Sequence, residues 1–295
     1  MDVKEYRKTY EAELAAASSP EASADPTAPA PQGADASRDS ALASIQEAPV
    51  ARDELHTTVP ALIRTLQNGA APKAVRIAAL RALRAARFLG EHFAPYHAEF
   101  LEACRKIVRP DTDADLRADA LEVLARERDP YAQDIIRKGL ENVQTALVPA
   151  AKGLQLLGYD DHANITDLAR RLFEKAQDVA TKAAALRILA RDAKSQGILE
   201  QLLKDKSQPR VLRALSATGL HFLNPQKFGE LARDIILDKS DFEDIRATSL
   251  GALATAPDHQ HLREDTSFLD AVKQLGRDTG LPNLNAAVGR FLTKS

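Results

Sequence analysis

The sequence reads Val-Arg-Ile-Ala-Ala-Leu-Arg-Ala-Leu at Val75–Leu83, Leu-Arg-Ala-Asp-Ala-Leu-Glu-Val-Leu at Leu116–Leu124 and Ile-Arg-Ala-Thr-Ser-Leu-Gly-Ala-Leu at Ile245–Leu253. These stretches share one nine-residue pattern: an aliphatic residue, Arg, two variable positions, a small residue, Leu, two more variable positions and Leu. The small and apolar positions lie on one side of an α-helix, as a buried helix face requires. The pattern therefore predicts helices that pack through their Leu and Ala positions.

The pattern recurs along the chain. Looser copies stand at Pro149–Leu157, Thr181–Leu189, Leu212–Leu220 and Leu284–Leu292. The seven copies begin at residues 75, 116, 149, 181, 212, 245 and 284, so their spacings are 41, 33, 32, 31, 33 and 39. A period in this range is the signature of a repeat array.

The composition indicates a soluble, cytoplasmic, all-helical protein. Apolar residues make up 44% of the chain and charged residues 28%, which supplies both a core and a solvated surface. Aromatic residues are only 5%, so Ala and Leu must fill the core, and this favours helices. The one cysteine, Cys104, is expected to be a small buried apolar group. We expect no signal peptide and no membrane span, because no long apolar run occurs.

The first fifty residues differ from the rest. Residues 1–17 predict a short amphipathic helix, because Val3, Tyr6, Tyr10 and Leu14 follow helical spacing. Residues 18–50 are rich in Ala, Pro, Ser and Asp and predict a disordered linker. We interpret the segment as a tethered docking helix that binds either this chain or a partner. A frayed terminal helix is the alternative.

Residues 51–295 predict a repeat domain of helix pairs, with each copy of the motif in the second helix of a pair. The expected second helices are Lys73–Leu89, Asp113–Glu127, Val143–Leu157, Asp178–Arg191, Pro209–Phe222, Asp241–Thr255 and Leu281–Thr293. The expected first helices are Phe93–Val108, Pro130–Leu140, Ile165–Lys175, Pro225–Leu237 and Asp265–Gly276. Asp and Pro residues at the starts supply N-terminal acceptors and tolerate the missing N–H.

Helix pairs with this motif resemble HEAT repeats, in particular the short bacterial type similar to PBS-lyase-type HEAT-like proteins. The resemblance implies an all-α fold, a right-handed α-solenoid of about seven stacked helix pairs. In HEAT repeats the Arg after the aliphatic residue commonly pairs with an acidic residue in the preceding turn. This implies that Asp111 or Asp113 pairs with Arg117, and that Asp241 or Asp244 pairs with Arg246. We therefore interpret the motif arginines as structural residues first.

The candidate binding residues are basic. Residues 51–110 carry ten Lys and Arg against five Asp and Glu, whereas residues 111–180 carry nine against fourteen. Ordinary scatter of solvated charge is one explanation, and steering of a charged partner is the other. The candidate partner-binding residues are Arg76, Arg81, Arg84 and Arg87, with Tyr6 and Tyr10 of the N-terminal segment.

No catalytic, cofactor or metal site is predicted. The chain lacks the Trp of HEAT-like DNA glycosylases and the His-Glu dipeptides of deoxyhypusine hydroxylases. A HEAT-like lyase remains open on architecture alone. His259 and His261 are interpreted as surface loop residues rather than metal ligands, and cap and packing roles account for the His92 and His97 region.

These features predict a non-catalytic scaffold or adaptor that binds protein through the concave face of the array. The partner is expected to be a protein, with acidic proteins among the candidates. One alternative is a HEAT-like lyase or enzyme-complex subunit. The other is nucleic-acid binding through the basic first repeats, which the isoelectric point near 6.4 disfavours.

Overall fold

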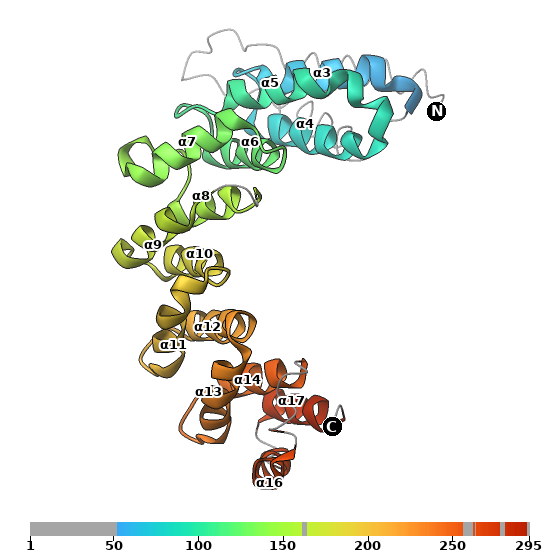
Figure 1. Ribbon diagram of the computed structural model, residues 1–295. Helices are drawn as coiled ribbons and strands as arrows, with labels where there is room; N and C mark the ends of the chain where they lie inside the picture. Colours follow the sequence, from blue (N-terminus) through green and yellow to red (C-terminus); the bar gives the residue numbers. More distant parts are fainter. Residues whose placement is uncertain (1–51, 161–163, 256–261, 263, 278–280, 294–295) are drawn as a thin grey trace, which may run out of the picture. The chain divides into compact units, whose positions relative to one another are not determined.

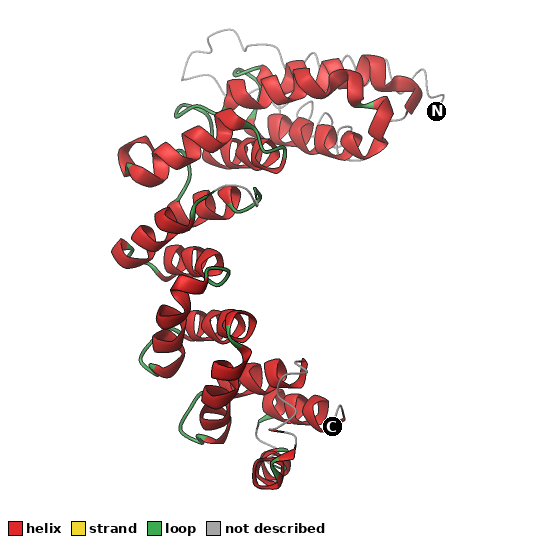
Figure 2. Ribbon diagram, in the orientation of Figure 1, coloured by secondary structure: helices red, strands yellow, loops and turns green. Residues whose placement is uncertain are grey.

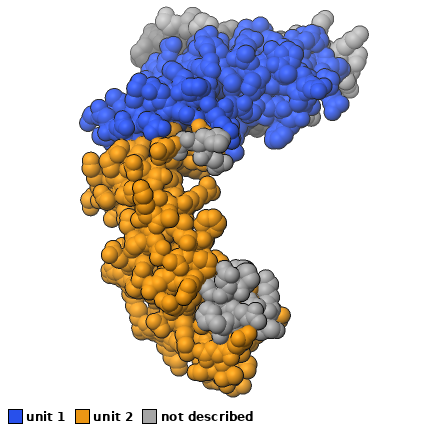
Figure 3. Space-filling view, in the orientation of Figure 1, with its two compact units in different colours: residues 1–149 blue, residues 150–295 orange. Residues whose placement is uncertain are grey.

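The computed structural model describes residues 52–160, 164–255, 262, 264–277 and 281–293. Within these ranges every regular element is an α-helix or a short 3-10 helix, and no strand occurs (Figure 2). The expectation of an all-α fold is therefore confirmed for this part of the chain. The chain divides into two compact units, Met1–Pro149 and Ala150–Ser295 (Figure 3).

The described part of the first unit contains two helix pairs and a further helix. Its α-helices are α3 (Leu55–Gln67), α4 (Lys73–Ala86), α5 (His97–Ile107), α6 (Ala114–Arg126) and α7 (Pro130–Glu141) (Figure 1). Helix α3 packs on α4 and α5 on α6, while α3 also contacts α5 and α4 contacts α6. First helices therefore lie against first helices and second against second, as in a repeat stack.

The second unit continues the same alternation. Its described helices are α8 (Ala150–Leu157), α9 (Thr166–Lys175), α10 (Val179–Leu189), α11 (Gln196–Lys204), α12 (Arg210–Leu223), α13 (Pro225–Leu237), α14 (Glu243–Thr255), α16 (Thr266–Leu275) and α17 (Pro282–Thr293). The pairs α9–α10, α11–α12, α13–α14 and α16–α17 are in contact. The second helices α8, α10, α12, α14 and α17 also contact one another in succession.

The repeated Leu and Ala positions form the core. The last Leu of the motif is fully buried at Leu83, Leu124, Leu220 and Leu253. Phe residues supplement these aliphatic positions, and the rings of Phe268 and Phe291 meet edge to face with their centroids 5.9 Å apart. The burial pattern thus confirms that the motif predicts one buried helix face.

Capping residues fix where the helices begin. The side chain of Asp113 accepts hydrogen bonds from the N–H groups of Asp115 and Leu116, and Asp178 accepts one from the N–H of Thr181. Asn224 caps α13 and Asp265 caps α16 in the same way. These acceptors satisfy N–H groups that have no partner inside the helix.

Two predicted helices begin later than expected, and proline explains both. The segment predicted at Val143–Leu157 forms a 3-10 turn at Val143–Thr145, and α8 starts only at Ala150, directly after Pro149. Proline fixes its own φ and disfavours the α conformation in the residue before it. Similarly, Pro95 lies in a 3-10 helix, so α5 starts at His97 instead of Phe93.

Candidate functional site

The motif arginines close the helix pairs to which they belong. The Nε of Arg76 donates to the carbonyl of Leu66 at 3.0 Å, and the Nε of Arg213 donates to the carbonyl of Leu203 at 3.0 Å. Arg246 donates to the carbonyl of a residue ten positions earlier, Ile236, at 2.9 Å. Each acceptor is the penultimate residue of the first helix, where carbonyls lack intrahelical partners. The interpretation of these arginines as structural residues fits this geometry.

The fourth motif arginine, Arg117, binds two loops through backbone carbonyls. Its Nη1 donates to the carbonyls of Arg109, Pro110 and Thr112 at 2.8–3.1 Å. Its Nε donates to the carbonyl of Leu147 at 2.8 Å. The expected pairing of Arg117 with Asp111 or Asp113 is therefore wrong, because carbonyl oxygens take the guanidinium donors.

Among the described residues, one of these arginines forms an ion pair, and its acidic partner belongs to the following repeat. Arg213 donates to both carboxylate oxygens of Asp241, at 2.6 and 2.7 Å, and both side chains are at most 1% exposed. Burial raises the pKa of Asp241, but the hydrogen bonds from Arg213 and from the N–H of Phe242 outweigh it and hold the pKa below its usual range. The expected pairing of Arg246 with Asp241 or Asp244 is therefore wrong, because Asp241 pairs with Arg213 and Asp244 lies 3.8 Å from Arg210.

The basic residues of the first unit face acidic residues of the same unit. Lys73 lies 2.7 Å from Asp115 and 3.0 Å from Asp113 at the start of α6. Further along α4, Arg84 lies 3.8 Å from Glu122. At the end of α4, Arg87 pairs with Glu127, which also lies 3.2 Å from Nε2 of His97. The opposite charges of residues 51–110 and 111–180 thus meet across α4 and α6.

The predicted arginine surface is therefore largely engaged inside the unit. Arg76 is half-buried, and burial lowers its pKa. Arg84 and Arg87 contact the acidic side chains of α6, and only Arg81 of the four is exposed. Tyr6 and Tyr10, the predicted N-terminal helix and the linker lie outside the described residues, as do His259 and His261.

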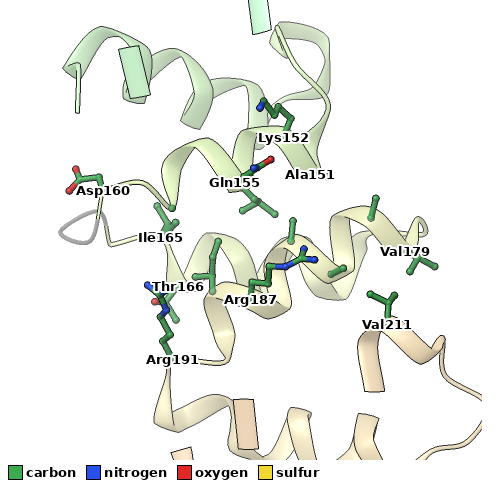
Figure 4. A pocket seen from close by; sticks show the side chains of 16 residues that line it. Ala151, Lys152, Gln155, Asp160, Ile165, Thr166, Val179, Arg187, Arg191 and Val211 are labelled. Atoms are coloured by element: carbon green, nitrogen blue, oxygen red, sulfur yellow. The ribbon is translucent and has the colours of Figure 1, made fainter. Parts of the chain in front are cut away.

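A groove in the second unit was not predicted from the sequence. It has a volume of about 1070 Å³, and its lining comes from α8, α10 and the starts of α9 and α12 (Figure 4). Small side chains form much of the surface along α10, at Ala180, Ala183 and Ala184. Val179 and Val211 form an apolar end, and both are about two-fifths exposed, at 40% and 43%.

The charged side chains of the groove lie away from this apolar end. In Figure 4, Asp160, Thr166 and Arg191 stand on the side opposite Val179 and Val211, and Arg187 lies between them. Among the described residues of the lining, three are cationic, Lys152, Arg187 and Arg191, and one is a carboxylate, Asp160. The groove therefore offers an excess of positive charge next to exposed aliphatic side chains.

The groove coincides with two of the three motif copies in which the arginine is replaced; the third copy, Leu284–Leu292, has Asn285 at that position. The copy at Pro149–Leu157 has Ala150 at that position, and the copy at Thr181–Leu189 has Lys182. Pro149 also shortens α8 to eight residues. These departures were visible in the sequence as looser copies, but which side chains surround a hollow depends on how the helices pack.

In the described part of the chain, no group of three or more His, Cys, Asp or Glu side chains is arranged to hold a metal ion. None of the helices described there combines the length and the apolar character that crossing a membrane requires. No protein-family model matches the chain, and no curated protein shows a significant match to it. The groove and its charges thus supply the argument for function.

Proposed function

We propose that the chain is a non-catalytic scaffold or adaptor that binds a protein through the second helices of a HEAT-like array. For each unit we propose the HEAT-like arrangement, a right-handed stack of helix pairs with the second helices on the inner face. The successive contacts of α8, α10, α12 and α14 support this arrangement. Residues 1–17, outside the described part, would serve as a tethered docking helix.

The groove along α8 and α10 is the observation that carries the proposal. A surface that is hollowed, partly apolar and bordered by cations has the properties of a protein-binding site, where exposed apolar groups gain by leaving water. Arg187 makes no hydrogen bond or ion pair within the described residues, whereas Arg76, Arg84 and Arg87 of the first unit already contact carbonyls and carboxylates. The second unit therefore takes the place of the predicted arginine surface as the first candidate for binding.

Site-directed photo-crosslinking tests this function. A photoreactive phenylalanine replaces Ala180 in the groove of the full-length chain, and a control variant carries it at Glu174, which is exposed on α9. In the native host we expect a discrete crosslinked protein from position 180 and none from position 174. Identical products from both positions, or none, would overturn the proposal.

Native mass spectrometry of the purified chain separates this function from the enzymatic alternative. A scaffold is expected to purify at the mass of its polypeptide. A retained chromophore or another small molecule that blocks crosslinking from position 180 would contradict the scaffold function and favour a lyase or an enzyme subunit.

A further inference from the structure

We infer that the groove of the second unit binds a short acidic segment of a partner protein, with at least one aliphatic side chain beside the acidic residues. This inference rests on the proposed function and adds the chemistry of the partner. It concerns residues of α8, α10 and α12 that all belong to one compact unit.

The charge of the groove selects an acidic ligand. Arg187 is exposed, and in the described part of the chain it makes no hydrogen bond or ion pair, so its guanidinium is available to a ligand. Guanidinium groups bind carboxylates through two parallel hydrogen bonds, which makes a Glu or Asp of the partner a matching group. Lys152 and Arg191 add positive charge at the same groove.

The aliphatic end of the groove selects a segment that is not purely acidic. Val179 and Val211 are partly exposed and stand side by side at one end of the lining in Figure 4. Covering them with a Val, Leu or Ile side chain would remove apolar surface from water. Because Arg187 lies between this end and the charged end in Figure 4, one ligand can place an aliphatic side chain on the valines and a carboxylate on the guanidinium.

The size of the groove fits a protein segment. Helix α10 spans Val179–Leu189, eleven residues, which corresponds to about 15 Å at the α-helical rise. A ligand of that length is about three turns of helix or roughly five extended residues. None of the described residues that line the groove is aromatic, which disfavours base stacking. The apolar end also interrupts the row of basic side chains that a phosphate backbone needs.

Selection from a displayed library of random 12-residue peptides against the full-length chain tests the inference. We expect the recovered peptides to be enriched in Asp and Glu beside Val, Leu or Ile. A labelled synthetic copy of a recovered peptide should then bind the full-length chain in fluorescence polarisation, and more weakly as salt rises, because exposed charge pairs are screened.

Matched variants locate the site. Arg187→Glu is expected to weaken binding about tenfold or more, since it replaces attraction by repulsion. Arg171→Glu is the control, because Arg171 is exposed on α9 and does not line the groove; it should leave binding unchanged. Val211→Asp should weaken binding similarly, whereas Val143→Asp, at a valine that is 80% exposed in the first unit, should not.

Several outcomes would overturn the inference. Peptides without an acidic excess, or binding that survives Arg187→Glu, would remove the charge argument. Peptides that reproduce the Val3, Tyr6 and Tyr10 spacing would point to the N-terminal segment of this chain as the occupant. If crosslinking from position 180 still recovers a protein, the proposed function stands while this partner chemistry fails.

Discussion

Removing the charge of Asp241 should strongly destabilise the second unit. Asp241 accepts two hydrogen bonds from Arg213, and the two side chains are 1% and 0% exposed. Asp241→Asn keeps the size of the side chain but leaves the guanidinium buried without its counter-charge. Loss of one partner of a buried ion pair costs about 3–5 kcal/mol. Two charge-assisted hydrogen bonds of about 1.5–3 kcal/mol each give a similar range.

Thermal and urea unfolding of the full-length chain, followed by circular dichroism, measure this loss. For a domain of this size about 1 kcal/mol shifts the melting temperature by about 2–4 °C, so we expect a fall of about 6–20 °C. Amide hydrogen exchange should show the loss in α12–α14, since repeat arrays need not unfold in one step. Asp270→Asn is the control, because that carboxylate is 75% exposed beside Lys273.

A double variant tests whether the loss comes from the unpaired charge. Arg213→Met with Asp241→Leu removes both charges and fills the same space with apolar groups, so it should recover at least half of the stability lost in Asp241→Asn. A double variant as unstable as the single one would refute the reasoning. So would an Asp241→Asn protein that unfolds like the unmodified chain.

Three further predictions concern stability and reactivity. Ser249→Ala should stabilise the chain by about 1 kcal/mol in urea unfolding, because the Ser249 hydroxyl is buried and no described residue hydrogen-bonds to it. Ser216→Ala should destabilise the chain by about as much, because Ser216 donates to the Leu212 carbonyl at 2.8 Å. Equal effects of the two substitutions would contradict this. Because the pKa of Asp241 is lowered in the folded chain, its carboxylate stabilises the fold fully above the usual pKa of 3.8. This stabilisation is lost as the pH falls through the folded-state pKa of Asp241. The Asp241→Asn variant should therefore lose less stability in acid than the unmodified chain. Burial raises the pKa of the Cys104 thiol to about 12, so a thiol reagent at pH 8 should label it only after denaturation, and rapid labelling of the native chain would show that this helix opens.

Most helices could be predicted from the sequence, because the periodicity and the capping residues that indicate them are local. The motif at Leu212–Leu220 places its buried residues by helical period alone, and Asp178 begins its helix through its own side chain. Helix α11 was not among the predicted first helices, although the structure shows it at Gln196–Lys204. It has nine residues and no side-chain cap, so its formation depends on packing against α12.

The partners of the charged residues could not be predicted from the sequence, because they depend on which repeats face each other. The sequence places Asp241 five residues before Arg246, and proximity along the chain suggests that pair. In the fold, Asp241 instead faces Arg213, which is 28 residues away. Arg84 and Glu122 are a second example. A charge count places them in two separate segments, 51–110 and 111–180, but the packing of α4 and α6 brings them together.

Three motif arginines donate hydrogen bonds to residues only ten positions earlier in the chain, and such local contacts favour early folding. The bonds from Arg76 to Leu66, from Arg213 to Leu203 and from Arg246 to Ile236 each close a short loop. Closing a loop of this length takes about 10–100 ns, and chains rich in local contacts fold quickly. Each helix pair can therefore form soon after it leaves the ribosome, before the next repeat has been synthesised.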